Sequence, residues 1–413
     1  MARKLKTAVV QPRYKKPNPL LYFVLWVGTL YIRLFYRATF DRQALKKVRS
    51  VKGPVIIVAS HHGPMDFTFA TQAVFPKRVS FVTAANIYYK PFLGWLFRFT
   101  KSNIPKKQFT TDFASVKSIR RMLDAGVSVV LYPEARFSIE GRNSRVSDSV
   151  FKLVKWLKVP VVTIKCNMSY QIRPRYIDDF RRGKVIIDVA NPISAADCET
   201  LSVAEIKERL TPWLTFNDME YQEAAKQYFR GKKGYAEGLP DLLYKCPKCG
   251  AEFAHKASGD IMECAVCGNS VEIDGYNTIK PHKEGSLYFR RIDLWYDYQY
   301  NELKKEISEN PDYTLSHNVR LFVNDENNYR FAPLEAGTVT LDRSGIVYRG
   351  TRYPEVRFRI PNPPAVSIDL IDHIDIFADD DTIFRFVFDG PEKPAKLNAA
   401  IEIIHDYYLS KGV

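Results

Sequence analysis

Residues 54–66 read PVIIVASHHGPMD, and this stretch decides the fold. The run at 54–60 is continuously apolar, which is typical of a strand buried on both faces of a sheet. Gly63 and Pro64 follow as turn residues, because glycine permits unusual dihedral angles and proline suits the first turn of a helix. The residues at 67–74 are compatible with a helix. The stretch therefore predicts a buried strand, a tight turn and a helix.

The segments around this stretch alternate in the same way. Further apolar runs predict buried strands at 80–83, 127–132, 159–164 and 185–189. A helix is expected over 111–125, and a second one after the capping box that Ser202 and Glu205 form. Strands that alternate with helices predict an α/β layered domain over residues 51–215.

Two histidines and an aspartate lie in the first turn. His61 and Asp66 are separated by four residues, and the turn can bring the carboxylate back onto the imidazole. A carboxylate on one ring nitrogen fixes the tautomer and leaves the other nitrogen able to take a proton, as a general base does. His62 is also within reach of Asp66 and is an alternative. This segment alone is equally compatible with a histidine that has no catalytic role.

A second polar segment, YPEARFS at 132–138, also follows an apolar strand. Both segments thus fall at the carboxyl ends of strands, where α/β folds place their sites. Arg136 offers a planar fork for phosphate, and Glu134 can orient it or hold a substrate hydroxyl. The two segments together predict one site.

The H-x4-D pattern and the YPE segment about 70 residues later resemble the glycerolipid acyltransferase family typified by lysophosphatidic acid acyltransferase. The usual sequence motifs of that family are N-H-x-S-x-x-D and F-P-E-G-T-R-S. The resemblance covers roughly residues 20–215 and includes KSNIPKKQ at 101–108, where the family has a basic phosphate-binding block, and the fourth block at 159–162. This chain departs from the family at four motif positions, namely Ser60, Gly63, Ala135 and the early Arg136.

The resemblance implies acyl transfer from a thioester of coenzyme A or acyl carrier protein to a glycerol hydroxyl, without a covalent enzyme intermediate. His61 would be the general base and Asp66 its orienting partner. Glu134 and Arg136 would hold the lysophospholipid acceptor. Candidates for contact with its phosphate are Lys101, Lys106 and Lys107, whose alternative is a solvated basic face.

Charge is distributed unevenly along the 413 residues, whose net charge is +15. Residues 1–240 contain 41 Lys and Arg against 18 acids, and residues 241–413 contain 20 against 28. A basic region requires an anionic partner, which can be nucleic acid, an anionic membrane surface or a phosphate-bearing substrate.

The apolar run LLYFVLWVGTLYI at 20–32 is flanked by basic residues on both sides. It is shorter than the roughly 20 residues that span a bilayer, so it predicts an interfacial anchor within a basic N-terminal segment, 1–50. Its aromatic residues suit the headgroup level: Tyr22, Trp26, Tyr31 and Tyr36. The expected location is the cytoplasmic face of the cell membrane. The alternative is a buried core helix.

Four cysteines form two identical C-x-x-C-G knuckles: Cys246, Cys249, Cys264 and Cys267. Their spacing suits a tetrahedral structural Zn²⁺ in a small zinc ribbon at 244–275, after a helical connector at 216–243. Zinc ribbons are frequent in nucleic-acid-binding proteins. Nucleic acid is nevertheless an unlikely partner, because the acidic half of the chain would repel a phosphate backbone.

The last segment, 276–413, contains short alternating runs that predict strands, separated by turn signals, at 318–323, 338–341, 345–348, 356–360, 366–370 and 382–388. It closes with an apolar-faced helix near 394–409. It predicts a β-rich domain with a C-terminal helix, similar to a pleckstrin-homology or GRAM-like domain. The chain as a whole is therefore expected to be a membrane-associated acyltransferase acting on 1-acyl-sn-glycerol-3-phosphate. The alternatives are an acyltransferase for another lipid acceptor and a non-catalytic lipid- or nucleic-acid-binding scaffold.

Overall fold

The computed structural model describes residues 15–109, 113–360, 365–378 and 380–410, which form two compact units. The α/β unit comprises Pro17–Val82 and Val116–Lys305. The C-terminal unit comprises Met1–Lys16, Thr83–Ser115 and Glu306–Val413. Each unit is described separately below. The five segments expected from the sequence are a different division of the chain and stay a prediction.

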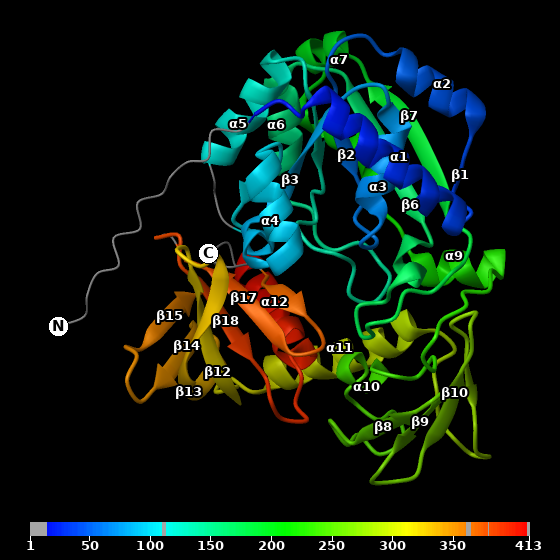
Figure 1. The fold of residues 1–413 in the computed structure, drawn as a ribbon. Helices are drawn as coiled ribbons and strands as arrows, with labels where there is room; N and C mark the ends of the chain where they lie inside the picture. The colour runs from blue at the N-terminus through cyan, green and yellow to red at the C-terminus, as the bar shows by residue number, and fades with distance from the viewer. Residues whose placement is uncertain (1–14, 110–112, 361–364, 379, 411–413) are drawn as a thin grey trace. The chain divides into compact units, whose positions relative to one another are not determined.

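The α/β unit is built on a largely parallel sheet (Figure 1). Six of its strands lie in the order β1 (Thr39–Phe40), β7 (Ile186–Ile193), β6 (Val161–Asn167), β2 (Ile56–Ala59), β5 (Ser128–Leu131) and β3 (Val79–Ala84). The pair β6–β7 is antiparallel, and every other neighbouring pair of these six is parallel. All residues of β2 and β5 are buried, so both faces of the sheet are covered. The predicted α/β layers and their strands are confirmed.

Two groups of helices cover this sheet. On one side α1 (Pro19–Phe35), α2 (Arg42–Ser50) and α3 (Asp66–Val74) pack together. On the other, α6 (Ser149–Leu157), α7 (Ala195–Thr200) and α8 (Val203–Leu214) do so. The capping box of Ser202 and Glu205 starts α8 as expected. Helix α5 (Phe113–Asp124) lies in the predicted helix 111–125, whose first two residues are outside the described ones.

Helix α1 carries the apolar run of the N-terminal segment, of which residues 1–14 are not described. Several of its large apolar side chains are exposed: Leu20, Phe23, Val24, Leu25, Val27, Tyr31 and Leu34. The expectation for its other aromatic residues was wrong. The Trp26 ring stacks on Phe75, Tyr22 donates a hydrogen bond to the Lys77 carbonyl, and Tyr36 is buried. Among the described residues, no helix combines the length and apolar character needed to cross a bilayer.

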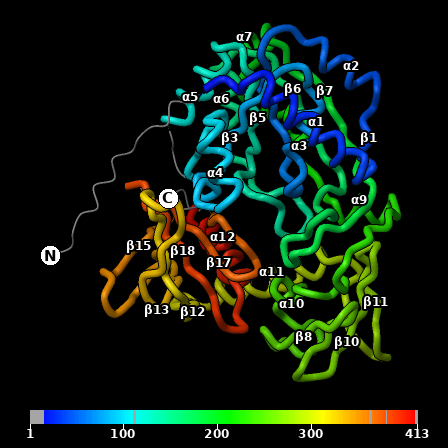
Figure 2. Tube along the Cα trace, in the orientation of Figure 1, coloured from blue at the N-terminus to red at the C-terminus, as the bar shows by residue number. Residues whose placement is uncertain are grey.

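The cysteine-containing part of the α/β unit is a small antiparallel sheet, visible in the lower part of Figure 2. Its strands lie in the order β11 (Ile279–Pro281), β10 (Ser270–Ile273), β9 (Ile261–Cys264) and β8 (His255–Ser258). Before it come two short helices, α9 (Asp218–Ala225) and α10 (Leu239–Leu242). After it comes α11 (Ile292–Glu309), whose Trp295 donates a hydrogen bond to the Lys245 carbonyl.

The C-terminal unit contains an antiparallel sheet followed by α12 (Ala395–Ser410), as the sequence predicted. The strands lie in the order β15 (Val356–Arg359), β14 (Gly345–Gly350), β13 (Arg330–Asp342), β12 (Leu315–Asp325), β18 (Ile383–Val387), β17 (His373–Phe377) and β16 (Ser367–Asp369). Strand β17 was not predicted, because Asp375 interrupts its apolar pattern. The same unit holds η1 (Ala85–Tyr89), α4 (Pro91–Thr100) and β4 (Ile104–Lys106).

Candidate active site and cysteine cluster

His61 and Asp66 meet in the turn between β2 and α3. The Nδ1 atom of His61 lies 3.2 Å from Oδ2 of Asp66, and the same oxygen accepts a hydrogen bond of 2.9 Å from the Gly63 amide. A Cβ atom on Gly63 would lie 2.7 Å from the Ser169 carbonyl oxygen, so only glycine fits this turn. The short turn thus aims the carboxylate at the imidazole, and Asp66 is 1% exposed against 17% for His61.

The surroundings of His61 favour a neutral ring. Tyr132 stacks on it at a centroid distance of 3.9 Å, and Phe137 lies against it at 4.3 Å. Burial lowers the pKa of His61, and the hydrogen bond to Asp66 opposes that shift only in part. Because a carboxylate accepts hydrogen bonds, Nδ1 carries the proton of the neutral ring and Nε2 keeps a lone pair. Within the described part of the chain, Nε2 has no hydrogen-bond partner, so this atom can accept a proton.

Glu134 and Arg136 follow β5, next to the turn that carries His61. The backbone amide of His61 donates to Oε1 of Glu134 at 3.2 Å, and burial raises the pKa of Glu134 to about 8. Arg136 is partly exposed and its Nε atom donates to the Ser144 hydroxyl at 3.2 Å. Between them, Ala135 has a φ of +59°, the left-handed region that favours glycine, where the acyltransferase motif has glycine. The contact of either residue with an acceptor stays a prediction.

The three candidate lysines lie in the C-terminal unit. The Nζ atom of Lys107 lies 2.5 Å from Oδ1 of Asp381 and 3.4 Å from the Ala378 carbonyl oxygen. Lys106 donates to the Lys107 carbonyl at 3.4 Å, and Lys101 ends α4. Phosphate contact by these lysines stays a prediction.

His62 does not contact Asp66, so the alternative that paired it with that carboxylate was wrong. Its Nδ1 atom lies 3.0 Å from Oδ1 of Asp218, and its Nε2 atom lies 2.8 Å from the Ser60 hydroxyl. Both partners of this second pair are buried, with His62 0% and Asp218 1% exposed. Sequence reasoning missed Asp218, which lies 156 residues away at the start of α9, where it resembles an ordinary acidic residue of a first helical turn.

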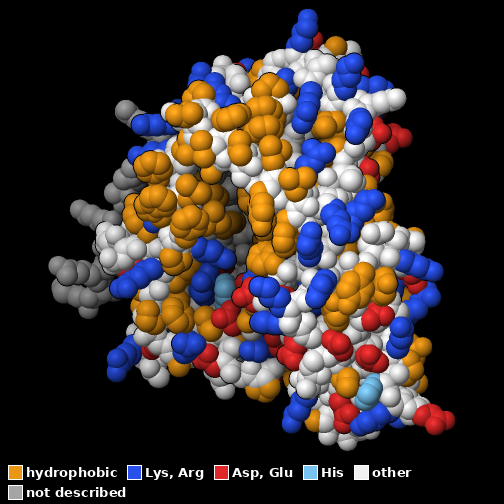
Figure 3. All heavy atoms as spheres, turned by 45° about the vertical axis from the view of Figure 1, so that its right-hand side comes forward, with side chains coloured by type: hydrophobic (Ala, Val, Ile, Leu, Met, Phe, Trp, Pro, Cys, Tyr) orange, Lys and Arg blue, Asp and Glu red, His pale blue; other side chains and the backbone are white. Residues whose placement is uncertain are grey.

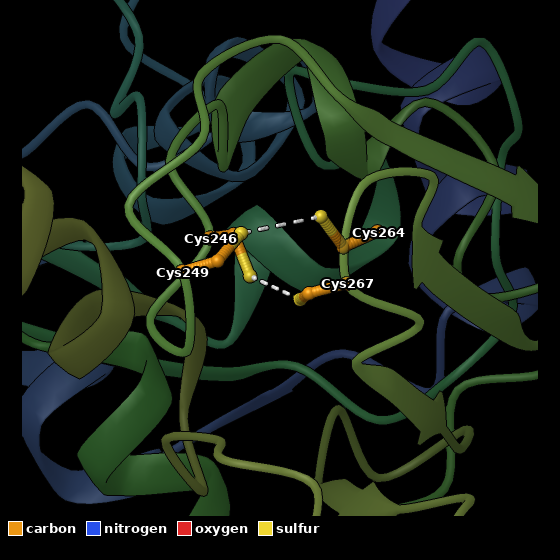
Figure 4. A group of neighbouring side chains, drawn as sticks. All are labelled: Cys246, Cys249, Cys264 and Cys267. Atoms are coloured by element: carbon orange, nitrogen blue, oxygen red, sulfur yellow. Dashed lines mark hydrogen bonds between the residues drawn. The ribbon is translucent and has the colours of Figure 1, made fainter.

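The four knuckle cysteines converge in one cluster, with their sulfur atoms pointing toward one another from two loops (Figure 4). The Sγ atoms all lie within 4.8 Å of one another, with Cys246 and Cys267 3.7 Å apart and Cys249 and Cys264 3.8 Å apart. Gly250 and Gly268 both have positive φ, at +75° and +68°, so the two knuckles turn alike. Sulfur ligands at about 2.3 Å from a tetrahedral zinc ion would be about 3.8 Å apart, so the donor set fits that metal.

Comparisons with known proteins agree with this geometry. Residues 40–167, which contain both motif segments, match the family described as Acyltransferase. The chain is 24% identical over 192 residues to a 1-acyl-sn-glycerol-3-phosphate acyltransferase of Saccharomyces cerevisiae, a match over 45% of this chain and 62% of the relative. It is 23% identical over 192 residues to a chloroplastic enzyme of the same description from Brassica napus, over 46% of this chain and 54% of the relative. The chain thus spans less than two thirds of each of these relatives.

A solved structure, the 1-acyl-sn-glycerophosphate acyltransferase PlsC from Thermotoga maritima, aligns with a TM-score of 0.40 and 15% identity over 50% of this chain and 80% of that one. The motifs and the family match show that residues 40–167 are similar to domains of the acyltransferase class. Within that class, the expected resemblance to 1-acyl-sn-glycerol-3-phosphate acyltransferases is confirmed.

Proposed function

We propose that this protein transfers a fatty acyl group from acyl-coenzyme A or acyl carrier protein to the free hydroxyl of 1-acyl-sn-glycerol-3-phosphate. The observation that carries the proposal is the His61–Asp66 pair, in which Asp66 holds Nδ1 and leaves the lone pair of Nε2 available. His61 takes the proton of the acceptor hydroxyl while the hydroxyl oxygen bonds to the thioester carbonyl carbon. The carbon–sulfur bond then breaks, and His61 returns the proton to the leaving sulfur.

The other predicted residues would bind the acceptor. Arg136 presents a guanidinium beside the site, and a guanidinium binds phosphate with two parallel hydrogen bonds. Glu134 holds the backbone of His61 and, with a pKa of about 8, is protonated at neutral pH. Lys101, Lys106 and Lys107 add positive charge for the acceptor phosphate.

The acceptor is a lipid, and α1 supports action at an anionic membrane surface. Its exposed apolar side chains belong to a region in which residues 1–110 contain 20 Lys and Arg but only two acids. On the face shown in Figure 3, hydrophobic side chains reach the surface with Lys and Arg side chains between them. Each basic residue near an anionic surface contributes about 1 kcal/mol of binding. We therefore place the protein at the cytoplasmic face of the membrane.

The cysteine cluster would hold a structural zinc ion in a zinc ribbon. Four thiolates fill the coordination sphere, so no position remains for a substrate. The antiparallel sheet and terminal helix of the C-terminal unit favour a pleckstrin-homology or GRAM-like domain. Metal analysis of the purified protein tests the ribbon, and the expected result is one zinc per chain. Less than half a metal ion of any kind per folded chain would contradict it.

The enzymatic proposal is tested with labelled acyl thioesters and a panel of lyso-acceptors in vesicles. We expect transfer to 1-acyl-sn-glycerol-3-phosphate, and transfer lowered at least about 100-fold in a folded, vesicle-bound His61→Ala variant. Transfer to a different acceptor would identify another lipid acyltransferase. A wild-type protein that binds vesicles but transfers nothing to any acceptor would be a scaffold.

A further inference from the structure

We propose that Asp218 is a positioning residue for acyl transfer, which fixes the loop that carries His61 although it does not touch that histidine. This role rests on the proposed function of the His61–Asp66 pair. Asp218 begins α9, outside the segment that matches the acyltransferase family and outside both motifs.

The Asp218 carboxylate joins two loops. Its Oδ1 atom lies 3.0 Å from Nδ1 of His62 and accepts the Met168 amide at 2.9 Å, and its Oδ2 atom accepts the Tyr170 amide at 3.1 Å. The intervening Ser169 has its carbonyl oxygen against Gly63, in the turn between His61 and Asp66. One buried side chain therefore holds both the catalytic turn and the backbone that presses on it.

His62 connects Asp218 to the loop of His61, because both nitrogens of the His62 ring have a polar partner. Its Nε2 atom lies 2.8 Å from the Ser60 hydroxyl, and Phe216 stacks on its ring at 3.5 Å. The residues on both sides of His61 in the chain are thus held to the same pair. A buried His62 ring with both nitrogens engaged has little freedom to move, so the backbone on either side of His61 is held in place.

A second connection runs through the backbone of Asp218. Its amide donates to the Gly141 carbonyl at 2.7 Å, and the Gly141 amide donates to the Ser138 hydroxyl at 2.8 Å. The Ser138 amide in turn donates to the His61 carbonyl at 3.1 Å. The start of α9 therefore supports the loop of the second motif as well as the loop of the first.

The His62–Asp218 pair also affects the electrostatic environment of His61. Burial acts to lower the pKa of His62, but the combined effect of the nearby carboxylates, led by Asp218, raises it. A protonated His62 lowers the pKa of His61, which faces Asp66, His62 and Arg175, while its backbone contacts Glu134. Removing the Asp218 charge lowers the pKa of His62, so less positive charge lies beside His61 and the pKa of His61 rises.

The test compares Asp218→Asn with Glu220→Gln, which removes a carboxylate from the first turn of the same helix but is exposed. We expect Asp218→Asn to lower kcat about 10- to 100-fold with KM within about twofold, because misplacement of a base by about 1 Å costs that much. The acidic limb of its kcat/KM profile should move to higher pH. Glu220→Gln should match the wild type in both measurements.

If Asp218 had only a structural role, Asp218→Asn would lower the maximum kcat/KM in proportion to the unfolded fraction and leave the pH of the acidic limb of the profile unchanged. This outcome would overturn the proposal. His62→Gln is the second variant, in case Asp218→Asn does not fold. It removes the charge of the His62 ring and should likewise move the acidic limb of the kcat/KM profile to higher pH. An NMR titration of the His61 ring gives a readout without catalysis. If the wild type transfers nothing, the proposed function fails, whereas an unshifted His61 titration in both variants rejects the role of Asp218.

Discussion

His61 and His62 are neighbours in the chain, and each pairs through Nδ1 with an aspartate, yet their environments differ. His61 is 17% exposed and its Nε2 atom has no partner among the described residues, whereas His62 is 0% exposed and both its nitrogens are engaged. Their pKa values shift in opposite directions, because burial dominates at His61 while the nearby carboxylates, led by Asp218, dominate at His62. The same residue pair therefore leaves a ring nitrogen without a partner among the described residues in one place and makes a fixed anchor in the other.

The largest effect that separates the two histidines is expected on catalysis. His61→Ala should lower kcat/KM about 10²- to 10⁴-fold, because general-base catalysis is worth that much. Initial rates with a labelled thioester in vesicles measure the effect. His62→Gln should lose less activity, about 10- to 100-fold, since the base itself is retained although the loop that carries it loses its anchor. Equal losses in the two folded variants would abolish the functional distinction between the pairs.

The next effect is expected on stability and has the opposite order. Asp218→Ala leaves a buried His62 without its carboxylate, and the free energy of unfolding should fall by about 3–5 kcal/mol. His61→Ala should change it by less than about 1 kcal/mol, because that ring is partly exposed and Asp66 keeps its bond from Gly63. Denaturant unfolding followed by circular dichroism measures both values. A similar loss in both variants would show that the pairs are energetically alike.

Glu134 sharpens the comparison, because its carboxyl lies near both pairs and has a pKa of about 8 against an ordinary value of 4.5. A raised pKa in the folded state stabilises the protein fully below pH 4.5, and this contribution is lost as the pH rises through 8. The wild type should therefore lose stability relative to Glu134→Gln between pH 5 and 8, by on the order of a few kcal/mol.

Thermal unfolding of both proteins across this pH range checks the expectation. Both histidines are present in both proteins, so their own titrations cancel in the difference apart from the coupling between His62 and Glu134. A difference that does not change with pH would mean that Glu134 is ionised in the folded protein.

The smallest effect concerns a more exposed pair, Lys107 and Asp381, with side chains 24% and 29% exposed. Such pairs contribute about 0.2–1 kcal/mol, and if Lys107 binds phosphate as proposed, Asp381 would compete with that phosphate for the ammonium. Asp381→Asn should therefore lower the KM for 1-acyl-sn-glycerol-3-phosphate by up to about fivefold and leave kcat unchanged. Asp380→Asn is the control. An unchanged KM in both variants would remove Lys107 from the acceptor site.

Most of the sheet and one of the two histidine pairs followed from the sequence, because both depend on local patterns. Short apolar runs such as 56–59 that are bounded by turn residues predict buried strands, and His61 and Asp66 share one turn. Asp218 could not be predicted, since only the packing of α9 brings it to His62. Strand β17 was missed for a similar reason: its buried Asp375 is neutralised by Arg385, which pairs with it at 2.8 Å from the next strand. Tertiary partners make both residues tolerable in the interior, and no local pattern reveals them.

The position of Asp218 also bears on how the protein is made. The ribosome delivers His62 long before Asp218, since 156 residues separate the two members of the anchor. A nascent chain that has reached Thr215 already contains both acyltransferase motifs but not the residue that connects their loops. Maturation of the catalytic loop thus waits for α9 to leave the ribosomal tunnel, and a fragment cut at that boundary would contain the motifs without their support.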